Sequence, residues 1–303
     1  MSILTHTVAP HQSGVTVREL LERQWHISAT LRRQLCCRPG ALLCNGQAAY
    51  LGQRVHIGDV VQADVSDEPG PPPPTGPYPL TLSVLWEDEH LLAIDKPAGV
   101  AVHDSALTAE KVTVAGAVLR YLGASVFHAV NRLDRGTSGV MLVAKNAYLH
   151  SRCTALLHTD ALRREYRAVC CGLPQPPEGR VDAPIARAPA SLLRRQVDAA
   201  GQPAVTDYRL LHHEKGLSLL ALYPHTGRTH QLRLHMAHLG CPLAGDWLYG
   251  QEDRSLIPRP ALHSYRLRFV HPITAQTVEV TAPLPPDLTA LLPLYGQQAA
   301  VVY

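Results

Sequence analysis

The 303-residue sequence has little lysine and few aromatic side chains. Phe, Trp and Tyr together make up 5% of the residues, and the 28 basic residues include four lysines, so 24 are arginines. Charged residues reach only 17% while apolar residues reach 46%, which is enough to bury a substantial core. Arginine binds phosphate through a planar fork of donors. The arginine bias therefore fits nucleic-acid contacts, and it fits a GC-rich coding sequence equally well.

Several other features are missing. No run of about 18 apolar residues occurs, which argues against a membrane span, and the N-terminus lacks the basic and then apolar segments of a secretory signal. The seven cysteines form no regular framework, which favours reduced thiols in the cytoplasm. No phosphate-cradling glycine loop or dinucleotide fingerprint is present. We therefore expect a cytoplasmic protein without a membrane segment and without a nucleotide cofactor.

A proline-rich segment divides the chain. Seven of the fourteen residues from Ser66 to Pro79 are proline, a composition that favours an extended, semi-rigid linker. The sequence thus predicts an N-terminal domain over 14–65, a linker over 66–79 and a larger domain over 80–303.

The N-terminal domain has the pattern of two helices followed by short strands. Apolar residues recur at helical spacing between Val17 and Trp25, and Ser28 can cap a second helix that runs through Leu35. Four arginines and no acidic residue lie between Arg32 and Arg54. The order of helices and turns resembles the S4-type RNA-binding module, although an ordinary solvated helix face would also be basic. We expect this domain to bind RNA.

The larger domain has clustered strands with few helices between them. This pattern predicts an α+β fold with a mixed, mainly antiparallel sheet and flanking helices. The expected strands lie near 84–87, 91–96, 140–144, 164–172, 204–211 and 217–223, with a closing hairpin over 263–282. The expected helices lie at 112–122 and 147–157, and a third, capped by Thr229, runs to residue 238.

One loop concentrates polar residues ahead of a core strand. In the segment Asn131 to Gly139, Asp134 lies between Arg132 and Arg135, and glycine, threonine and serine follow. These residue types favour a turn, and the apolar run after them predicts a buried strand. Neighbouring guanidinium groups would stabilise the negative charge that a nucleophile or base requires. A surface aspartate in a salt-bridged turn would give the same pattern.

Five motifs in order resemble the RluA-type pseudouridine synthases. They are KPAG (96–99), RLDRGTSG (132–139), REYRAVCCG (164–172), HTGRTHQLRLHMAHLGCPLAGDWLYG (225–250) and LHSYRLRFVHP (262–272), and the match covers about 84–283. An S4-like module ahead of this domain is a common arrangement in that family. The resemblance implies isomerisation of uridine within RNA: the base leaves its N-glycosidic bond, turns, and rejoins through carbon 5. It implies no cofactor and no metal.

The resemblance also implies roles for particular residues. Asp134 is the essential aspartate, which either attacks the anomeric carbon of the ribose or removes the 2′ proton. Tyr166 is the active-site tyrosine, which stacks on the base with its hydroxyl placed for a proton at carbon 5. Arg228 is expected to pair with the aspartate. The residues expected to contact RNA are Arg32, Arg33, Arg38, Asn45, Arg132, Arg135 and Arg233.

The chain departs from the family pattern at three positions. Asn131 stands where a histidine is usual, and Arg164 and Gln202 each replace a usual lysine. Thr137 and Ser138 are expected to shape the loop. The histidines at 230, 235 and 238, with Cys241, match no metal-binding pattern. We predict a monomer that modifies ribosomal RNA rather than transfer RNA. The alternative is a non-catalytic RNA-binding or ribosome-assembly factor that retains the fold.

Overall fold

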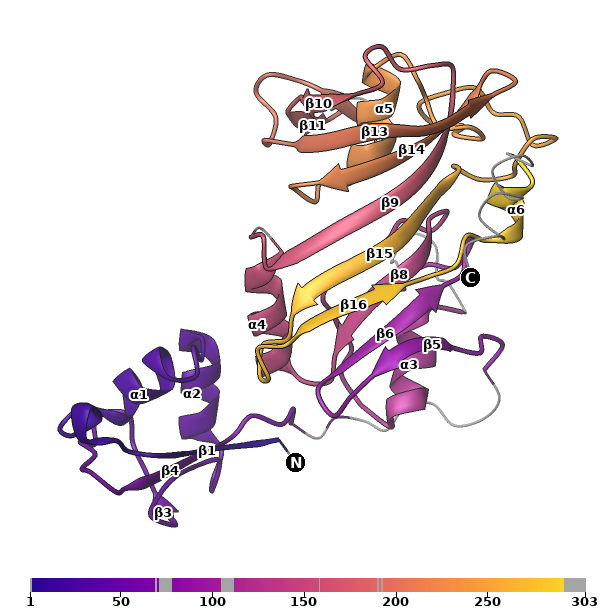
Figure 1. Ribbon diagram of the computed structural model, residues 1–303. Helices are drawn as coiled ribbons and strands as arrows, with labels where there is room; N and C mark the ends of the chain where they lie inside the picture. The colour runs from indigo at the N-terminus through magenta and orange to yellow at the C-terminus, as the bar shows by residue number, and fades with distance from the viewer. Residues whose placement is uncertain are drawn as a thin grey trace.

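The computed structural model describes residues 2–68, 70, 78–104, 112–157, 159–189, 191 and 193–291. Most of the predicted linker, Pro69 and residues 71–77, lies outside these residues. Figure 1 shows a small N-terminal unit at one end of a larger body that is built on a long sheet. Every helix among the described residues is too short or too polar to span a lipid bilayer.

The N-terminal unit is a four-stranded sheet with two helices. Its elements are β1 (Ile3–Thr7), α1 (Val17–Arg23), α2 (Ala29–Cys37), β2 (Leu42–Cys44), β3 (Gln47–Ala48) and β4 (Val60–Asp64), and its strand order is β1-β4-β2-β3. As the sequence predicts, Ser28 caps α2, because its hydroxyl accepts a hydrogen bond from the Leu31 amide at 3.2 Å. Strand β1 pairs with β4, so the sheet includes residues ahead of Gly14, where the sequence placed the start of the domain.

The large body confirms the predicted α+β fold. A ten-stranded sheet crosses its described residues in the order β10-β13-β14-β9-β15-β8-β6-β5, with β16 beside β15 and β7 beside β8. All neighbours pair antiparallel except β15 and β8, which are parallel. The strands are β5 (Ser83–Glu87), β6 (Leu91–Lys96), β7 (His128–Ala129), β8 (Ser138–Ala144), β9 (Leu162–Cys171), β10 (Glu178–Asp182), β13 (Val205–Glu214), β14 (Leu217–Pro224), β15 (Leu262–Val270) and β16 (Thr277–Thr281). A separate hairpin joins β11 (Ile185–Arg187) to β12 (Arg195–Val197).

Four helices of the described residues flank this sheet: α3 (Val114–Leu122), α4 (Ala147–Leu156), α5 (Gln231–His238) and α6 (Pro286–Thr289). The predicted cap of α5 is wrong. The helix begins after His230, not Thr229, and His230 has left-handed backbone angles and no side-chain capping bond. Instead, the Gln231 side chain accepts a hydrogen bond from the Arg228 amide at 3.0 Å, which fixes the loop ahead of the helix.

Strand β8 lies at the centre of the body, and all seven of its residues are buried. Its alternate side chains reach two core clusters: Val140 and Leu142 pack with α4, whereas Met141 and Val143 pack with α3 and α5. Gly139 has a φ of +106°, and a Cβ there would lie 2.2 Å from the Ser264 carbonyl oxygen. Glycine at this position therefore allows β15 to pair directly after the Asp134 loop.

The N-terminal unit contacts α4 of the body. The Tyr148 hydroxyl donates to the Trp25 carbonyl at 3.0 Å, and the Asp67 carboxylate accepts hydrogen bonds from His128 and from the Ala147 amide. One apolar cluster runs from α1 and α2 into α4 and β8. These contacts place the unit against the same helix that forms part of the cavity wall described below.

Candidate active site

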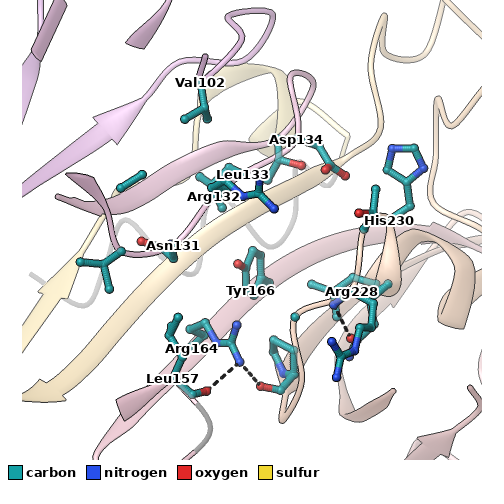
Figure 2. A pocket seen from close by; sticks show the side chains of 18 of the residues that line it. Val102, Asn131, Arg132, Leu133, Asp134, Leu157, Arg164, Tyr166, Arg228 and His230 are labelled. Atoms are coloured by element: carbon teal, nitrogen blue, oxygen red, sulfur yellow. Dashed lines mark hydrogen bonds between the residues drawn. The ribbon is translucent and has the colours of Figure 1, made fainter. Parts of the chain in front are cut away.

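A cavity of about 730 Å³ opens on the body at the loop before β8. Its walls come from this loop, the start of β9, the loop between β14 and α5, the first turn of α5 and the far end of α4. Asp134, Tyr166 and Arg228 all line it (Figure 2). The sequence motifs thus meet at one cavity, although they are up to about a hundred residues apart.

The Asp134 side chain is 33% exposed, so the carboxylate faces solvent within the cavity. Two buried cations support the backbone of its loop. The Lys96 ammonium donates to the Arg135 carbonyl at 3.3 Å, and an Arg259 guanidinium nitrogen donates to the Gly136 carbonyl at 3.0 Å. Because both donors are buried, they hold the turn in one conformation while leaving the carboxylate itself free.

The arginine that pairs with Asp134 is Arg233, not Arg228. Nη1 of Arg233 lies 4.0 Å from the Asp134 carboxylate. Its Nε and Nη2 each donate at 2.7 Å to the carboxylate of Asp246, which is fully buried. The ring of Tyr249 lies 5.2 Å from the guanidinium carbon. Arg233 is therefore fixed on two sides and presents its remaining edge to Asp134.

Arg228 has a different orientation from the one expected. Its Nε donates to the Pro203 carbonyl at 3.1 Å, and Figure 2 shows its guanidinium directed away from Asp134. The residue precedes α5, whereas Arg233 lies in the first turn of that helix. The position of α5 places Arg233, and not Arg228, beside the Asp134 carboxylate.

Tyr166 lies on β9 and is 7% exposed. Its ring faces the middle of the cavity in Figure 2. Burial raises the pKa of the Tyr166 hydroxyl. The side chain is therefore a neutral phenol at neutral pH and offers a flat apolar face with a polar tip.

Two of the unusual residues have structural contacts. The buried Asn131 side chain accepts a hydrogen bond from the Leu142 amide at 2.7 Å, which satisfies a backbone donor of β8. Arg164 donates to the Pro224 carbonyl at 3.1 Å and so connects β9 to the end of β14. Both residues also line the cavity.

Several residues expected to contact RNA also form contacts within the protein. Arg38 donates to the carbonyls of Ser66 and Asp64, and Arg135 donates to the Gly99 carbonyl at 2.9 Å. The Asn45 side chain bridges Asp59 and Val60. These bonds orient the three side chains, and Asn45 and Arg135 remain exposed.

The remaining candidates differ in exposure. Arg32 donates to the Ile27 carbonyl and is half-buried, whereas Arg33 is exposed. Arg132 is exposed and lines the cavity. Arg33 and Arg132 therefore retain the accessibility that a phosphate contact requires.

Sequence reasoning missed five residues of the site. Four of them support or face the cavity residues: Lys96, Asp246, Tyr249 and Arg259. Nothing in the sequence marked them individually as functional, although the first three lie inside recognisable motifs. His230 was considered only as a metal ligand, and the structure places it on the cavity wall. Its backbone is left-handed, a conformation that the sequence does not display for a non-glycine residue.

Comparison with known proteins gives a consistent result. Residues 90–238 match the family model described as RNA pseudouridylate synthase. The chain is 42% identical over 217 residues to the uncharacterized RNA pseudouridine synthase YjbO of Bacillus subtilis, covering 71% of this chain and 76% of that protein. It is 36% identical over 279 residues to ribosomal large subunit pseudouridine synthase D of Xanthomonas campestris, covering 87% and 83%. The solved structure of human RNA pseudouridylate synthase domain containing 1 has a TM-score of 0.58 at 25% identity and covers 73% of this chain and 96% of its own.

Proposed function

Because this chain belongs to the RNA pseudouridylate synthase family, in agreement with its RluA-type motifs, we propose that it isomerises uridines in ribosomal RNA of the large subunit. The enzyme class follows from the family. The substrate class is supported by relatives named for the large ribosomal subunit, which match up to 95% of this chain. The observation that carries the proposal is the meeting of Asp134, Tyr166 and Arg233 at one cavity.

We propose that Asp134 acts on the ribose of the target uridine. The carboxylate is accessible, yet its loop is fixed by buried donors, as a reacting group requires. The reaction breaks the bond from carbon 1′ to nitrogen 1 and forms one from carbon 1′ to carbon 5. One proton leaves carbon 5 and one is gained at nitrogen 1, so atoms balance without a cofactor. Attack at carbon 1′ and removal of the 2′ proton both place the sugar against Asp134.

Arg233 is the proposed positioning residue for this carboxylate. Its pairing with buried Asp246 fixes the guanidinium before RNA arrives, so no reorganisation is needed when the sugar enters. Tyr166 provides the stacking surface for the extruded uracil. Its hydroxyl is the polar group proposed to lie near carbon 5.

Accessible arginines support binding of the RNA backbone, since Arg33 and Arg132 are exposed and Arg228 is half-buried on the cavity wall. We propose Arg132 and Arg228 at the cavity and Arg33 on the N-terminal unit as phosphate contacts. We also propose that the enzyme works as a monomer in the cytoplasm, because Asp134, Tyr166 and Arg233 of one chain make up the proposed reacting set and the substrate is an RNA.

The test replaces Asp134 by Asn and by Ala and measures pseudouridine in ribosomal RNA by mass spectrometry. Turnover should fall by roughly a thousandfold or more, while RNA affinity changes little. Asp160→Asn is the matched control, since its side chain is 94% exposed in a surface ion pair. Wild-type turnover in Asp134→Ala would exclude Asp134 as the reacting group. RNA binding by the wild type without pseudouridine on any native RNA would favour the non-catalytic factor.

A further inference from the structure

His230 occupies a constrained position on the cavity wall. It immediately precedes α5 with a φ of 59°, an uncommon backbone conformation for a residue with a side chain. Its imidazole makes no capping bond to the helix. Figure 2 shows the ring at the side of the cavity where Asp134 also lies. The side chain is therefore directed by something other than the helix.

That partner is the hydroxyl of Tyr249, 3.0 Å from Nδ1 of His230. The same hydroxyl oxygen accepts a hydrogen bond from the backbone amide of Arg195 at 2.9 Å. A backbone amide can only donate, so Arg195 takes a lone pair of the hydroxyl oxygen. Among the described residues Nδ1 is the one acceptor within reach of the hydroxyl hydrogen, and we infer that the hydroxyl donates to Nδ1. Burial raises the pKa of Tyr249, which keeps this hydrogen in place.

The hydrogen bond from the Tyr249 hydroxyl determines the tautomer of the His230 imidazole. When Nδ1 accepts, the neutral ring carries its proton on Nε2. Burial lowers the pKa of His230, and although the charge of Asp134 opposes this effect, the net shift favours the neutral ring. Nε2 has no hydrogen-bond partner among the described residues. The cavity wall therefore carries an N–H donor on the side where Asp134 also lies.

We propose that His230 recognises the ribose of the target nucleotide by donating its Nε2 hydrogen to the 2′-hydroxyl oxygen. This inference rests on the proposed function, which places carbons 1′ and 2′ of the sugar against Asp134. The 2′-hydroxyl is bonded to carbon 2′, and it is the group that distinguishes RNA from DNA at a binding site. His230 would thus restrict the enzyme to ribonucleotides, a role separate from the reacting carboxylate.

The test is a double-mutant cycle on binding. The probe is a short RNA that contains the uridine modified by the wild type, synthesised with either uridine or 2′-deoxyuridine at that position. For the wild type, the deoxy change should raise the Kd about five- to tenfold, as loss of one neutral hydrogen bond does. His230→Ala should bind the uridine RNA as weakly as the wild type binds the deoxyuridine RNA. The deoxy change should then have no further effect on the Kd of the variant.

Two further variants separate the hydrogen bond from general packing. Gln places an amide nitrogen near the position of Nε2, so His230→Gln should keep most of the deoxy penalty. Asn places its amide near Nδ1, so His230→Asn should lose the penalty. Tyr249→Phe keeps the ring against Arg233 but removes the hydroxyl, so either nitrogen of His230 can carry the proton. This variant should therefore show a smaller deoxy penalty. His238→Ala, exposed at the other end of α5, is the control and should match the wild type.

The outcomes distinguish the two proposals. If the wild type modifies the RNA but His230→Ala keeps the full deoxy penalty, the ribose contact is overturned while the enzyme assignment stands. The same penalty with a loss of turnover in His230→Ala would indicate contact with a uracil carbonyl and would also overturn it. If the wild type modifies no RNA, both proposals fall.

Discussion

Nη1 of Arg233 lies 4.0 Å from the Asp134 carboxylate, on the one edge of the guanidinium that Asp246 leaves open. The two carboxylates differ in environment: Asp246 is fully buried, whereas Asp134 is one-third exposed. Asp246 therefore fixes the cation, and Asp134 keeps the freedom to contact a sugar. A separation of 4.0 Å is longer than a hydrogen bond, which leaves room for the pair to close when substrate enters.

Replacing Arg233 by Lys should reduce turnover far more than replacing Arg228 by Lys. Lysine keeps the charge but cannot form the two parallel bonds to Asp246, so the cation shifts and the carboxylate loses its fixed neighbour. We expect kcat to fall roughly tenfold to a hundredfold, because displacements near 1 Å have such effects. Arg228→Lys, the matched variant in the same motif, should mainly raise KM. A larger loss of kcat in Arg228→Lys would restore the pairing inferred from sequence.

Asn131→Ala should destabilise the fold. The Leu142 amide, buried in the central strand, would lose the acceptor that now lies at 2.7 Å, and an unsatisfied buried donor costs about 1–3 kcal/mol. The free energy of unfolding in urea measures this change. Gln47→Ala, at an exposed position of β3, is the control with a comparable loss of amide. An unchanged urea midpoint for Asn131→Ala would show that water accepts the hydrogen bond of the Leu142 amide in place of the side chain.

Much of the fold could be predicted because local signals agree with the tertiary structure. The run over 140–144 is buried on both faces as β8, and the Ser28 cap begins α2 as expected. Short strands such as β1 and β7 were missed. A five-residue strand with alternating exposure, or a two-residue strand, carries too few apolar residues to show a period.

The site was predicted less completely because its contacts are long-range. Arg228 and Arg233 lie in one motif. Which of them pairs with Asp134 depends on how the start of α5 is oriented over the Asp134 loop, about a hundred residues earlier. The Arg135 guanidinium likewise donates to the Gly99 carbonyl, a contact that the sequence does not display. Sequence shows the charge of a side chain and not which backbone oxygen lies beside it.

Stability should fall as the pH decreases from 6.5 to 4, in part through His263. The ring is buried between the Ser138 hydroxyl at 2.9 Å and the Ala282 carbonyl at 3.2 Å, and burial lowers its pKa to about 4. The unfolded chain takes up a proton near pH 6.5 and the folded chain does not, so protonation favours unfolding across this range. The stability lost is roughly 3 kcal/mol, since each pH unit between the two pKa values contributes about 1.4 kcal/mol.

Unfolding measured in urea at pH 7 and pH 4.5 checks this effect. His263→Gln keeps a donor toward the Ala282 carbonyl but does not titrate, so its stability should depend less on pH than that of the wild type. His238→Gln, exposed on α5, should retain the wild-type dependence. Parallel slopes for His263→Gln and the wild type would rule out this contribution.

Lys96 should produce a pH dependence in the alkaline range. Its ammonium is fully buried and donates to the carbonyls of Pro97, Val100 and Arg135, and burial lowers its pKa to about 7. Between pH 7 and about 10.5 the unfolded chain keeps a proton that the folded chain has released. Stability from this group therefore rises with pH across that range and is constant below it.

Lys96→Met should remove the rise while leaving three carbonyls without their donor. We therefore expect a lower free energy of unfolding at pH 7 and a flatter profile up to pH 10, with reduced kcat because the Arg135 carbonyl, next to Asp134, loses its support. Lys215→Met, exposed in the turn between β13 and β14, should follow the wild-type profile. If Lys96→Met shows the same alkaline rise as the wild type, the buried amine is not its source.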